Sequence, residues 1–157
     1  MTVYLVRHAE AKSRGHWKGD DRLRTLTKKG ERQAKGLIHH LADADVSRVV
    51  SSPAVRCIDT VGPLATKHAV DVEVDEALFE AMPMKAALRV LLDAAGAKGD
   101  TVVCTHGDLV PEVLRALNKE GLRLVDDLRY AKGSTWVLTG NDQKLTEGRY
   151  LPPPGDP

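Results

Sequence analysis

The stretch Thr2-Val-Tyr-Leu-Val6 runs directly into Arg7-His8, and this junction decides the predicted fold. So short a run is not a helix, and it is apolar on both faces, which is typical of a buried central strand. Thr101-Val-Val-Cys-Thr105 has the same character and is followed at once by His106-Gly107. Because such strands alternate with longer stretches whose apolar residues recur at helical spacing, the sequence predicts an α/β fold.

The remaining elements follow from caps and periodicity. Residues 11–26 are polar and contain glycine, which favours a surface loop, and Thr27 is a candidate cap for the helix after it. Ser52-Pro53 has the pattern of a helix start, and Pro83 opens another helix that ends near Gly96. The other expected elements are strands at Ser47–Ser51 and Val70–Val74, a helix after His106-Gly107 that continues to about Asn118, and one or two outer strands in the remainder, which includes Ser134–Thr139 and Leu145–Leu151.

Size and composition indicate one domain. The chain has 157 residues, of which 42% are hydrophobic and 29% charged, and this excludes wholesale disorder. We expect a single domain over residues 1–151 and a proline-rich tail over residues 152–157. Cys57 and Cys104 lie in apolar stretches, so we expect buried free thiols in a reducing compartment.

The balance of charged residues limits the classes of partner that the protein is expected to bind. The 23 Lys and Arg residues nearly balance the 22 Asp and Glu residues, and the formal net charge is +1. No global field therefore attracts nucleic acid or a membrane, and neither is expected as a partner. The amino terminus has no basic start or cleavage pattern, and no apolar run approaches the ~20 residues that span a bilayer. We expect a cytoplasmic protein.

Basic side chains fall at three predicted strand ends. Arg7-His8 and His106-Gly107 each follow a strand directly, and Arg56 lies in the first turn of the helix after the strand Ser47–Ser51. In open α/β sheets ligands bind beyond the carboxyl ends of the strands, where helix N-termini favour anions. Taken singly, each residue is more often a surface group or an ion-pair partner. Together they predict a phosphate site.

A phosphate site that does chemistry needs a nucleophile. Cysteine phosphatases place an arginine at a fixed distance after the cysteine, but Val110 and Pro63 occupy the corresponding positions after Cys104 and Cys57. The glycine-rich motif of a P-loop is also missing. These absences leave a histidine nucleophile, for which His8 is the better placed candidate.

The segment Leu5-Val-Arg-His-Ala-Glu-Ala11 resembles the R-H-[G/A] signature of the histidine phosphatase superfamily, also called the phosphoglycerate mutase-like family. The alanine form is typical of its short phosphohistidine phosphatases of the SixA type. The stretch Lys12–Arg24 is similar to the histidine phosphatase domain appended to some Nudix hydrolases, although the chain has no room for a Nudix domain. Three further segments match the family in order and spacing: Arg24–Gly30, Ser51–Thr60 and Val103–Gly107.

The resemblance implies a three-layer α/β/α sandwich with a mostly parallel central sheet. It also implies a two-step mechanism, in which His8 attacks phosphorus to give a phosphohistidine and water then releases phosphate. Arg7, Arg56 and His106 would hold the phosphoryl oxygens. The family needs no metal ion or other cofactor, and the long insertions that mutases use are missing here, which favours a phosphatase.

The proton donor for the leaving group is less sharply defined. Leu78-Phe-Glu80 resembles the family segment that supplies an acid, which favours Glu80, with Asp75 and Glu76 as close competitors. Asp108 is the second choice, although Gly107 separates it from His106. Relatives of the SixA type can lack the acid, because a phosphoramidate leaving group needs less help.

Residues 12–24 carry five cations near the predicted site. They are candidates to hold a second phosphate or the acidic surface of a phosphoprotein, although Asp20 and Asp21 offset them and a solvated loop is the alternative. Trp17 either stacks on a base or anchors the loop. We rank a nucleotide or small phosphorylated metabolite above a phosphohistidine protein. The candidate substrate-binding residues are Lys12, Ser13, Lys18, Arg22, Arg24, Gly107 and Asp108.

Two rival functions remain at this stage. The first is a phospho-ligand binding or regulatory module that keeps the arginines and histidines without turnover. The second is a metal-dependent hydrolase, with His8, Glu10, His16 and His106 as its candidate ligands, but no dense ligand motif supports it.

Overall fold

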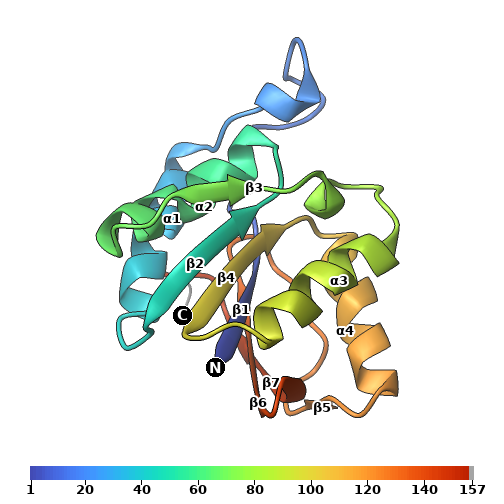
Figure 1. Ribbon diagram of the computed structural model, residues 1–157. Helices are drawn as coiled ribbons and strands as arrows, with labels where there is room; N and C mark the ends of the chain where they lie inside the picture. Colours follow the sequence, from blue (N-terminus) through green and yellow to red (C-terminus); the bar gives the residue numbers. More distant parts are fainter. Residues whose placement is uncertain (156–157) are drawn as a thin grey trace.

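The computed structural model describes residues 1–155 of the chain, so the end of the predicted tail, residues 156–157, lies outside the described part. Over the described range the helices are α1 (Lys28–His40), α2 (Val55–Lys67), α3 (Met84–Ala95) and α4 (Leu109–Lys119) (Figure 1). The strands are β1 (Thr2–Arg7), β2 (Val46–Ser51), β3 (Val72–Val74), β4 (Asp100–Thr105), β5 (Arg123–Leu124), β6 (Thr135–Asn141) and β7 (Lys144–Leu151). The predicted α/β fold is confirmed.

Within residues 1–155 the strands form one seven-stranded mixed sheet in the order β3-β2-β4-β1-β6-β7-β5. Strands β1 to β4 pair in parallel. Strand β6 runs antiparallel to both β1 and β7, and β5 pairs in parallel with β7. The parallel half of the sheet therefore brings the carboxyl ends of β1, β2 and β4 to one edge.

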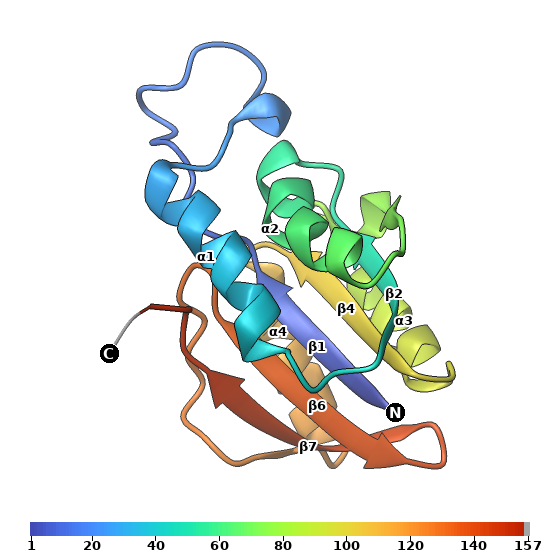
Figure 2. The ribbon, with the colours of Figure 1, turned by 90° about the vertical axis from the view of Figure 1, so that its left-hand side faces the viewer.

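Helices cover both faces of this sheet (Figure 2). On β1, Val3 and Leu5 belong to the apolar cluster beneath α3 and α4, whereas Val6 belongs to the cluster beneath α1 and α2. Because successive side chains of a strand point to opposite faces, this alternation buries the strand on both sides, as its apolar sequence predicts. Over the described residues no helix has the length and apolar character that crossing a membrane requires.

Helix starts follow the sequence signals at one site and depart from them at another. The Thr27 hydroxyl accepts a hydrogen bond from the Gly30 amide, so the predicted cap of α1 is confirmed. Helix α2 begins at Val55 rather than at the predicted Ser52-Pro53. The Ser52 hydroxyl contacts the His106 ring at 2.8 Å and accepts a hydrogen bond from the Ala54 amide at 3.3 Å, so it closes the turn that precedes α2 rather than the first turn of the helix.

The segment between β1 and α1 extends beyond the carboxyl edge of the sheet (Figures 1 and 2). It is pinned at its base by a bridge between Ala11 and Leu26, and it contains a short 3-10 helix, η1 (Asp21–Leu23). This arrangement places the segment over the ends of the strands that carry the predicted phosphate site. We call residues 12–24 the β1–α1 loop.

Candidate active site

His8 lies just after β1 at the carboxyl edge of the sheet, with 6% of its surface exposed. Its Nδ1 is 2.8 Å from the Ala9 carbonyl oxygen, and a carbonyl only accepts, so Nδ1–H is the donor and Nε2 carries the lone pair. Burial lowers the pKa of His8 to about 3, and electrostatic interactions with His106, Arg56 and Arg7 act in the same direction, against the Ala9 hydrogen bond, which raises this pKa. The ring is therefore neutral near pH 7, as a nucleophilic nitrogen requires.

His106 follows β4 and lies edge-on to His8, with 5.3 Å between the ring centres. Its Nε2 is 2.8 Å from the Ser52 hydroxyl and 3.6 Å from the Cys57 sulfur. Its Nδ1 is buried and has no hydrogen-bond partner among residues 1–155. The predicted burial of Cys57 as a free thiol is confirmed, and this thiol packs beneath the candidate site.

Arg7 is held in place by two features at the edge of the sheet. Its Nη1 donates to the Tyr130 carbonyl at 2.7 Å. The guanidinium group also lies over Gly107, where an added Cβ would be 2.5 Å from the Arg7 Cζ. Gly107 therefore acts by leaving room for Arg7, because any side chain at this position would displace the guanidinium group.

Arg56 is fully buried, and its guanidinium group is covered by two carboxylates. Its Nη1 donates to the Asp21 carbonyl at 2.8 Å, and its Nη2 donates to Asp21 Oδ2 at 3.2 Å and to Glu80 Oε1 at 3.3 Å. Partial burial raises the pKa of Asp21, but the hydrogen bond from Arg24 and the charges of Arg56, Arg24 and Arg14 outweigh this effect and hold the pKa at about 2. Asp21 is thus a charged partner of Arg56.

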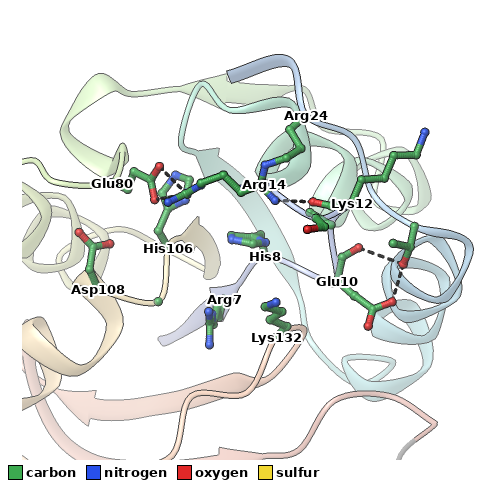
Figure 3. Close-up of a pocket in the computed structure, with 14 residues that line it drawn as sticks. Arg7, His8, Glu10, Lys12, Arg14, Arg24, Glu80, His106, Asp108 and Lys132 are labelled. Carbon is green, nitrogen blue, oxygen red and sulfur yellow. Dashed lines mark hydrogen bonds and ion pairs between the residues drawn. The ribbon is translucent and has the colours of Figure 1, made fainter. Parts of the chain in front are cut away.

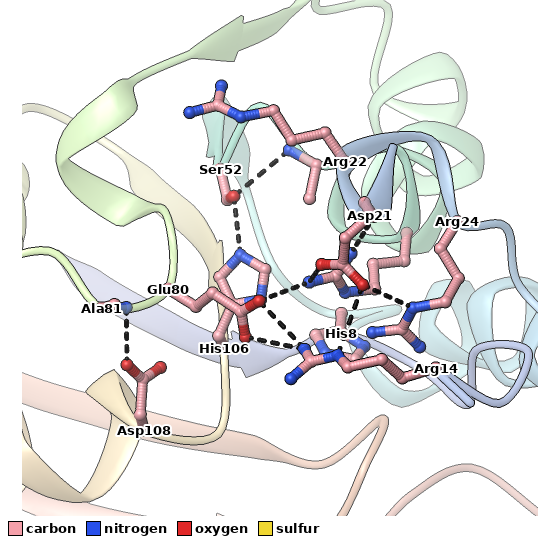
Figure 4. Close-up of polar contacts among 12 residues, drawn as sticks. His8, Arg14, Asp21, Arg22, Arg24, Ser52, Glu80, Ala81, His106 and Asp108 are labelled. Atoms are coloured by element: carbon pink, nitrogen blue, oxygen red, sulfur yellow. Dashed lines mark hydrogen bonds and ion pairs between the residues drawn. The ribbon is translucent and has the colours of Figure 1, made fainter. Parts of the chain in front are cut away.

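Glu80 lies beside His106 and forms an ion pair with Arg14 (Figure 4). Arg14 Nη2 donates to both Glu80 oxygens, at 2.9 and 3.1 Å. Asp108, the second candidate for the proton donor, instead accepts a hydrogen bond from the Ala81 amide at 2.8 Å. Both carboxylates border the site, so their positions alone do not decide between them.

These side chains surround a cavity of about 680 Å³ (Figure 3). His8 lies between Glu80, His106 and Asp108 on one side and Glu10 and Lys12 on the other. Of the other predicted residues, Arg56 does not line this cavity, because Asp21 covers it. The predicted residues that do line it are Arg7, His8, Lys12, Ser13, Arg24, Glu80, His106, Gly107 and Asp108.

Two predicted substrate-binding residues lie away from the cavity. Lys18 is exposed near the tip of the β1–α1 loop and is not part of the cavity lining. Arg22 forms an ion pair with Glu76 at 2.9 Å, and its guanidinium group lies 4.2 Å from the centre of the Phe79 ring. The ion pair and the aromatic contact orient Arg22 away from His8.

Lys132 lines the cavity although the sequence analysis did not select it. Lys132 precedes β6, which runs antiparallel to β1. The amino-terminal end of β6 therefore lies at the carboxyl edge of β1, and this brings Lys132 to the site. Its neighbour Gly133 donates to the carbonyl oxygens of His8 and Arg7, which fixes this segment next to the nucleophile. No sequence signal at Lys132 indicated that β6 reverses direction.

The described residues contain no group of three or more His, Cys, Asp or Glu side chains arranged to hold a metal ion.

Comparison with known proteins identifies the class to which this fold and site belong. The model of the histidine phosphatase superfamily (branch 1) matches residues 3–86. The chain is also 36% identical to the 8-oxo-(d)GTP phosphatase of Mycolicibacterium smegmatis, over 99% of this chain and 49% of that protein. The chain belongs to the histidine phosphatase superfamily, and the resemblance stated from its motifs is confirmed. It spans about half the length of this curated relative.

Solved structures agree at the level of the fold. A protein histidine phosphatase SixA complexed with tungstate is 18% identical with a TM-score of 0.75, and the match covers 96% of this chain and 94% of that one. A mycobacterial glucosyl-3-phosphoglycerate phosphatase is 15% identical with a TM-score of 0.69 and 99% coverage of both chains. Proteins with different named substrates share the fold, so the fold alone does not choose a substrate.

Proposed function

We propose that this chain is a metal-independent phosphatase that hydrolyses a phosphomonoester or phosphoramidate through a phosphohistidine intermediate on His8. The observation that carries the proposal is the state of His8. Its Nδ1–H is bound to the Ala9 carbonyl, and its low pKa leaves Nε2 with a free lone pair at the centre of a cavity lined with cations.

In the first step, His8 Nε2 attacks phosphorus in line with the leaving group. The new N–P bond forms while the P–O or P–N bond to the leaving group breaks, and the electron pair goes to the leaving atom. Glu80 is the proposed proton donor to that atom. Glu80 accepts hydrogen bonds from Arg14 through both oxygens and from Arg56 Nη2 through Oε1, so these contacts must open and the carboxylate must gain a proton before it can deliver one.

The negative charge that grows on the phosphoryl oxygens is held by donors from Arg7, Arg56 and His106. Arg7 Nε, Arg56 Nε and His106 Nδ1 are buried and have no partner within residues 1–155, so the phosphoryl oxygens are the partners we propose for this cluster. Arg56 Nη2 joins them once Asp21 gives way to the substrate. Arg7 and His106 are preorganised and stabilise the transition state without reorganisation, whereas Arg56 contributes only after Asp21 has moved.

In the second step, water attacks the phosphohistidine. The N–P bond breaks, the electron pair returns to Nε2, and inorganic phosphate leaves. Glu80, left as a carboxylate when it gave its proton to the first product, is now the base that takes a proton from the attacking water, by microscopic reversibility. His8 is restored to its neutral form.

For the substrate, we favour a nucleotide-type or other small phosphorylated molecule over a phosphohistidine protein. The cavity is lined by Lys12, Arg14, Arg24 and Lys132 in addition to Arg7, which suits a small, highly charged ligand. The relative that spans this chain in full is named as a phosphatase of 8-oxo-(d)GTP, which supports a nucleotide.

The test is phosphate release, in EDTA, from a panel of phosphomonoesters, nucleotides and phosphohistidine, with His8→Ala beside the parent protein. The proposal predicts turnover in chelator that the substitution abolishes. Activity that survives His8→Ala excludes the mechanism, and activity that EDTA removes excludes metal independence. Phosphate binding without turnover of any compound favours the alternative of a phospho-ligand binding module.

A further inference from the structure

A second cavity of about 440 Å³ adjoins the catalytic cavity on the far side of the Arg14–Glu80 ion pair. Arg14 and Glu80 line both cavities, so a molecule that reaches from one to the other passes this pair. Its lining comes from two segments far apart in the sequence: Arg14, Trp17, Gly19 and Asp21 of the β1–α1 loop, and Phe79 and Glu80.

Trp17 is the unusual residue of this second cavity. It is half-buried in a loop whose neighbouring residues are exposed, and it belongs to none of the apolar core clusters of residues 1–155. Its indole N–H donates to the Asp20 carbonyl at 2.9 Å, which fixes the side chain without burying it in the core. The Lys12 ammonium lies over the indole ring, 6.0 Å from its centre, so the face left for a flat ring is the opposite one.

Phe79 supplies the second aromatic wall. One face of its ring carries the Arg22 guanidinium group, 4.2 Å from the ring centre, and the ring also contacts His106 edge-on at 5.4 Å. Phe79 therefore has a fixed orientation and links the aromatic cavity to a residue of the phosphate site. The ion pair between Arg22 and Glu76 holds the stacked guanidinium group in place.

We propose that the Trp17–Phe79 cavity binds the planar base of a nucleotide whose phosphate lies against His8. This inference rests on the proposed function and names the substrate class for that site. Along the surface, the groups that bind the phosphate come first, then Arg14, and then the aromatic walls of Trp17 and Phe79. A nucleoside 5′-phosphate has its phosphate, ribose and base in the same order.

Occupation of both cavities also explains why Arg14 and Glu80 lie between them. Arg14 is 63% exposed and binds Glu80 through one nitrogen, so a substrate phosphate or ribose oxygen competes directly for its donors. When Arg14 turns to the substrate, Glu80 loses both of its hydrogen bonds from Arg14 and keeps only the one from Arg56 Nη2, at 3.3 Å. A nucleotide thereby loosens the hold on the proposed proton donor, whereas a phosphate ester without a base holds Arg14 less well.

The first test compares adenosine 5′-monophosphate with ribose 5-phosphate, which have the same scissile bond and differ by the base. We expect the ratio of their kcat/KM values to fall on the order of tenfold or more in Trp17→Ala, and less in Trp17→Phe. Leu23→Ala is the matched control, because Leu23 is an exposed apolar residue of the same loop that lines neither cavity. An unchanged ratio in Trp17→Ala overturns the proposal.

The second test measures binding and does not depend on turnover. In a His8→Ala background, adenosine 5′-monophosphate should quench tryptophan fluorescence, ribose 5-phosphate should not, and Trp17→Phe should abolish the quenching. The other tryptophan, Trp136, is fully buried and gives a constant background. Equal effects of the two compounds contradict the base site. If the parent protein releases phosphate from no compound of the panel described above while base-dependent quenching persists, the phosphatase proposal fails and the base site stands.

Discussion

Asp21 covers Arg56 with both its side chain and its backbone. The Asp21 carbonyl accepts from Arg56 Nη1 at 2.8 Å, and Oδ2 accepts from Nη2 at 3.2 Å. A carboxylate and a phosphoryl group bind a guanidinium group in the same way, so we propose that Asp21 occupies the position of the phosphoryl group and that a substrate competes with the β1–α1 loop for the buried arginine.

This competition predicts opposite effects of Asp21→Asn on stability and on phosphate affinity. Loss of the charge leaves buried Arg56 less well paired, which lowers the melting temperature, and it raises the affinity for inorganic phosphate on the order of tenfold. Thermal melts with and without phosphate measure both effects. Asp20→Asn is the control. It removes a neighbouring charge, and the asparagine side chain can still accept the hydrogen bond that the Arg22 amide donates to Asp20. The same phosphate-induced shift in both variants would contradict the competition.

Gly107→Ala tests the position of Arg7. The new methyl group would lie 2.5 to 2.7 Å from three atoms of the Arg7 guanidinium group, so the group must move. We expect kcat/KM to fall about 10- to 100-fold, since displacement of a positioning donor costs this much. Gly62→Ala in α2 is the control, because a methyl group there would meet no atom within 4 Å beyond the helix itself, and alanine favours a helix. Equal activity of the two variants would disprove this role of Gly107.

Glu80→Gln tests whether Glu80 or Asp108 is the proton donor. If Glu80 protonates the leaving group, its loss slows hydrolysis of an alkyl phosphate on the order of 10²-fold and hydrolysis of 4-nitrophenyl phosphate far less, because nitrophenolate leaves without a proton. Asp108→Asn should affect both substrates alike. Glu76→Gln controls for the loss of a nearby ion-paired carboxylate. A leaving-group dependence that appears in Asp108→Asn and not in Glu80→Gln would assign the donor to Asp108.

The low pKa of His8 predicts that this residue lowers the stability of the folded protein in acid. The folded state binds no proton at His8 until the pH approaches about 3, whereas the unfolded chain binds one near the ordinary histidine pKa of about 6.5. Unfolding in this window takes up a proton, so stability falls as the pH is lowered from about 6.5 toward 3. Urea unfolding between about pH 4.5 and 6.5 should show a slope steeper by up to about 1.4 kcal/mol per pH unit in the parent than in His8→Gln. Equal slopes would mean that His8 is not held neutral.

The central part of the site was predictable because it depends on local sequence. Arg7 is the last residue of β1, His8 and His106 directly follow β1 and β4, and parallel pairing of these two strands is enough to bring the three side chains to one edge. The cap of α1 at Thr27 depends on neighbouring residues in the same way. A strand end and the residues next to it are read from a few consecutive positions.

The parts that were not predicted depend on contacts between distant segments. Asp21 and Arg56 are separated by 35 positions, and only the path of the β1–α1 loop brings them together. Composition placed Asp21 among charges that offset the basic loop, whereas in the structure it is the partner of the buried arginine. Lys132 escaped notice because the prediction considered segments that follow strands, and Lys132 precedes an antiparallel one.

The most direct test of the mechanism is to trap the intermediate. The parent protein is mixed with a turned-over substrate in EDTA, quenched in base, in which phosphohistidine survives, and analysed by peptide mass spectrometry. The mechanism predicts the mass of one phosphoryl group on the peptide that contains His8, and its absence from His8→Ala. A phosphoryl group on any other residue of the parent protein, or one that persists in His8→Ala, would contradict it.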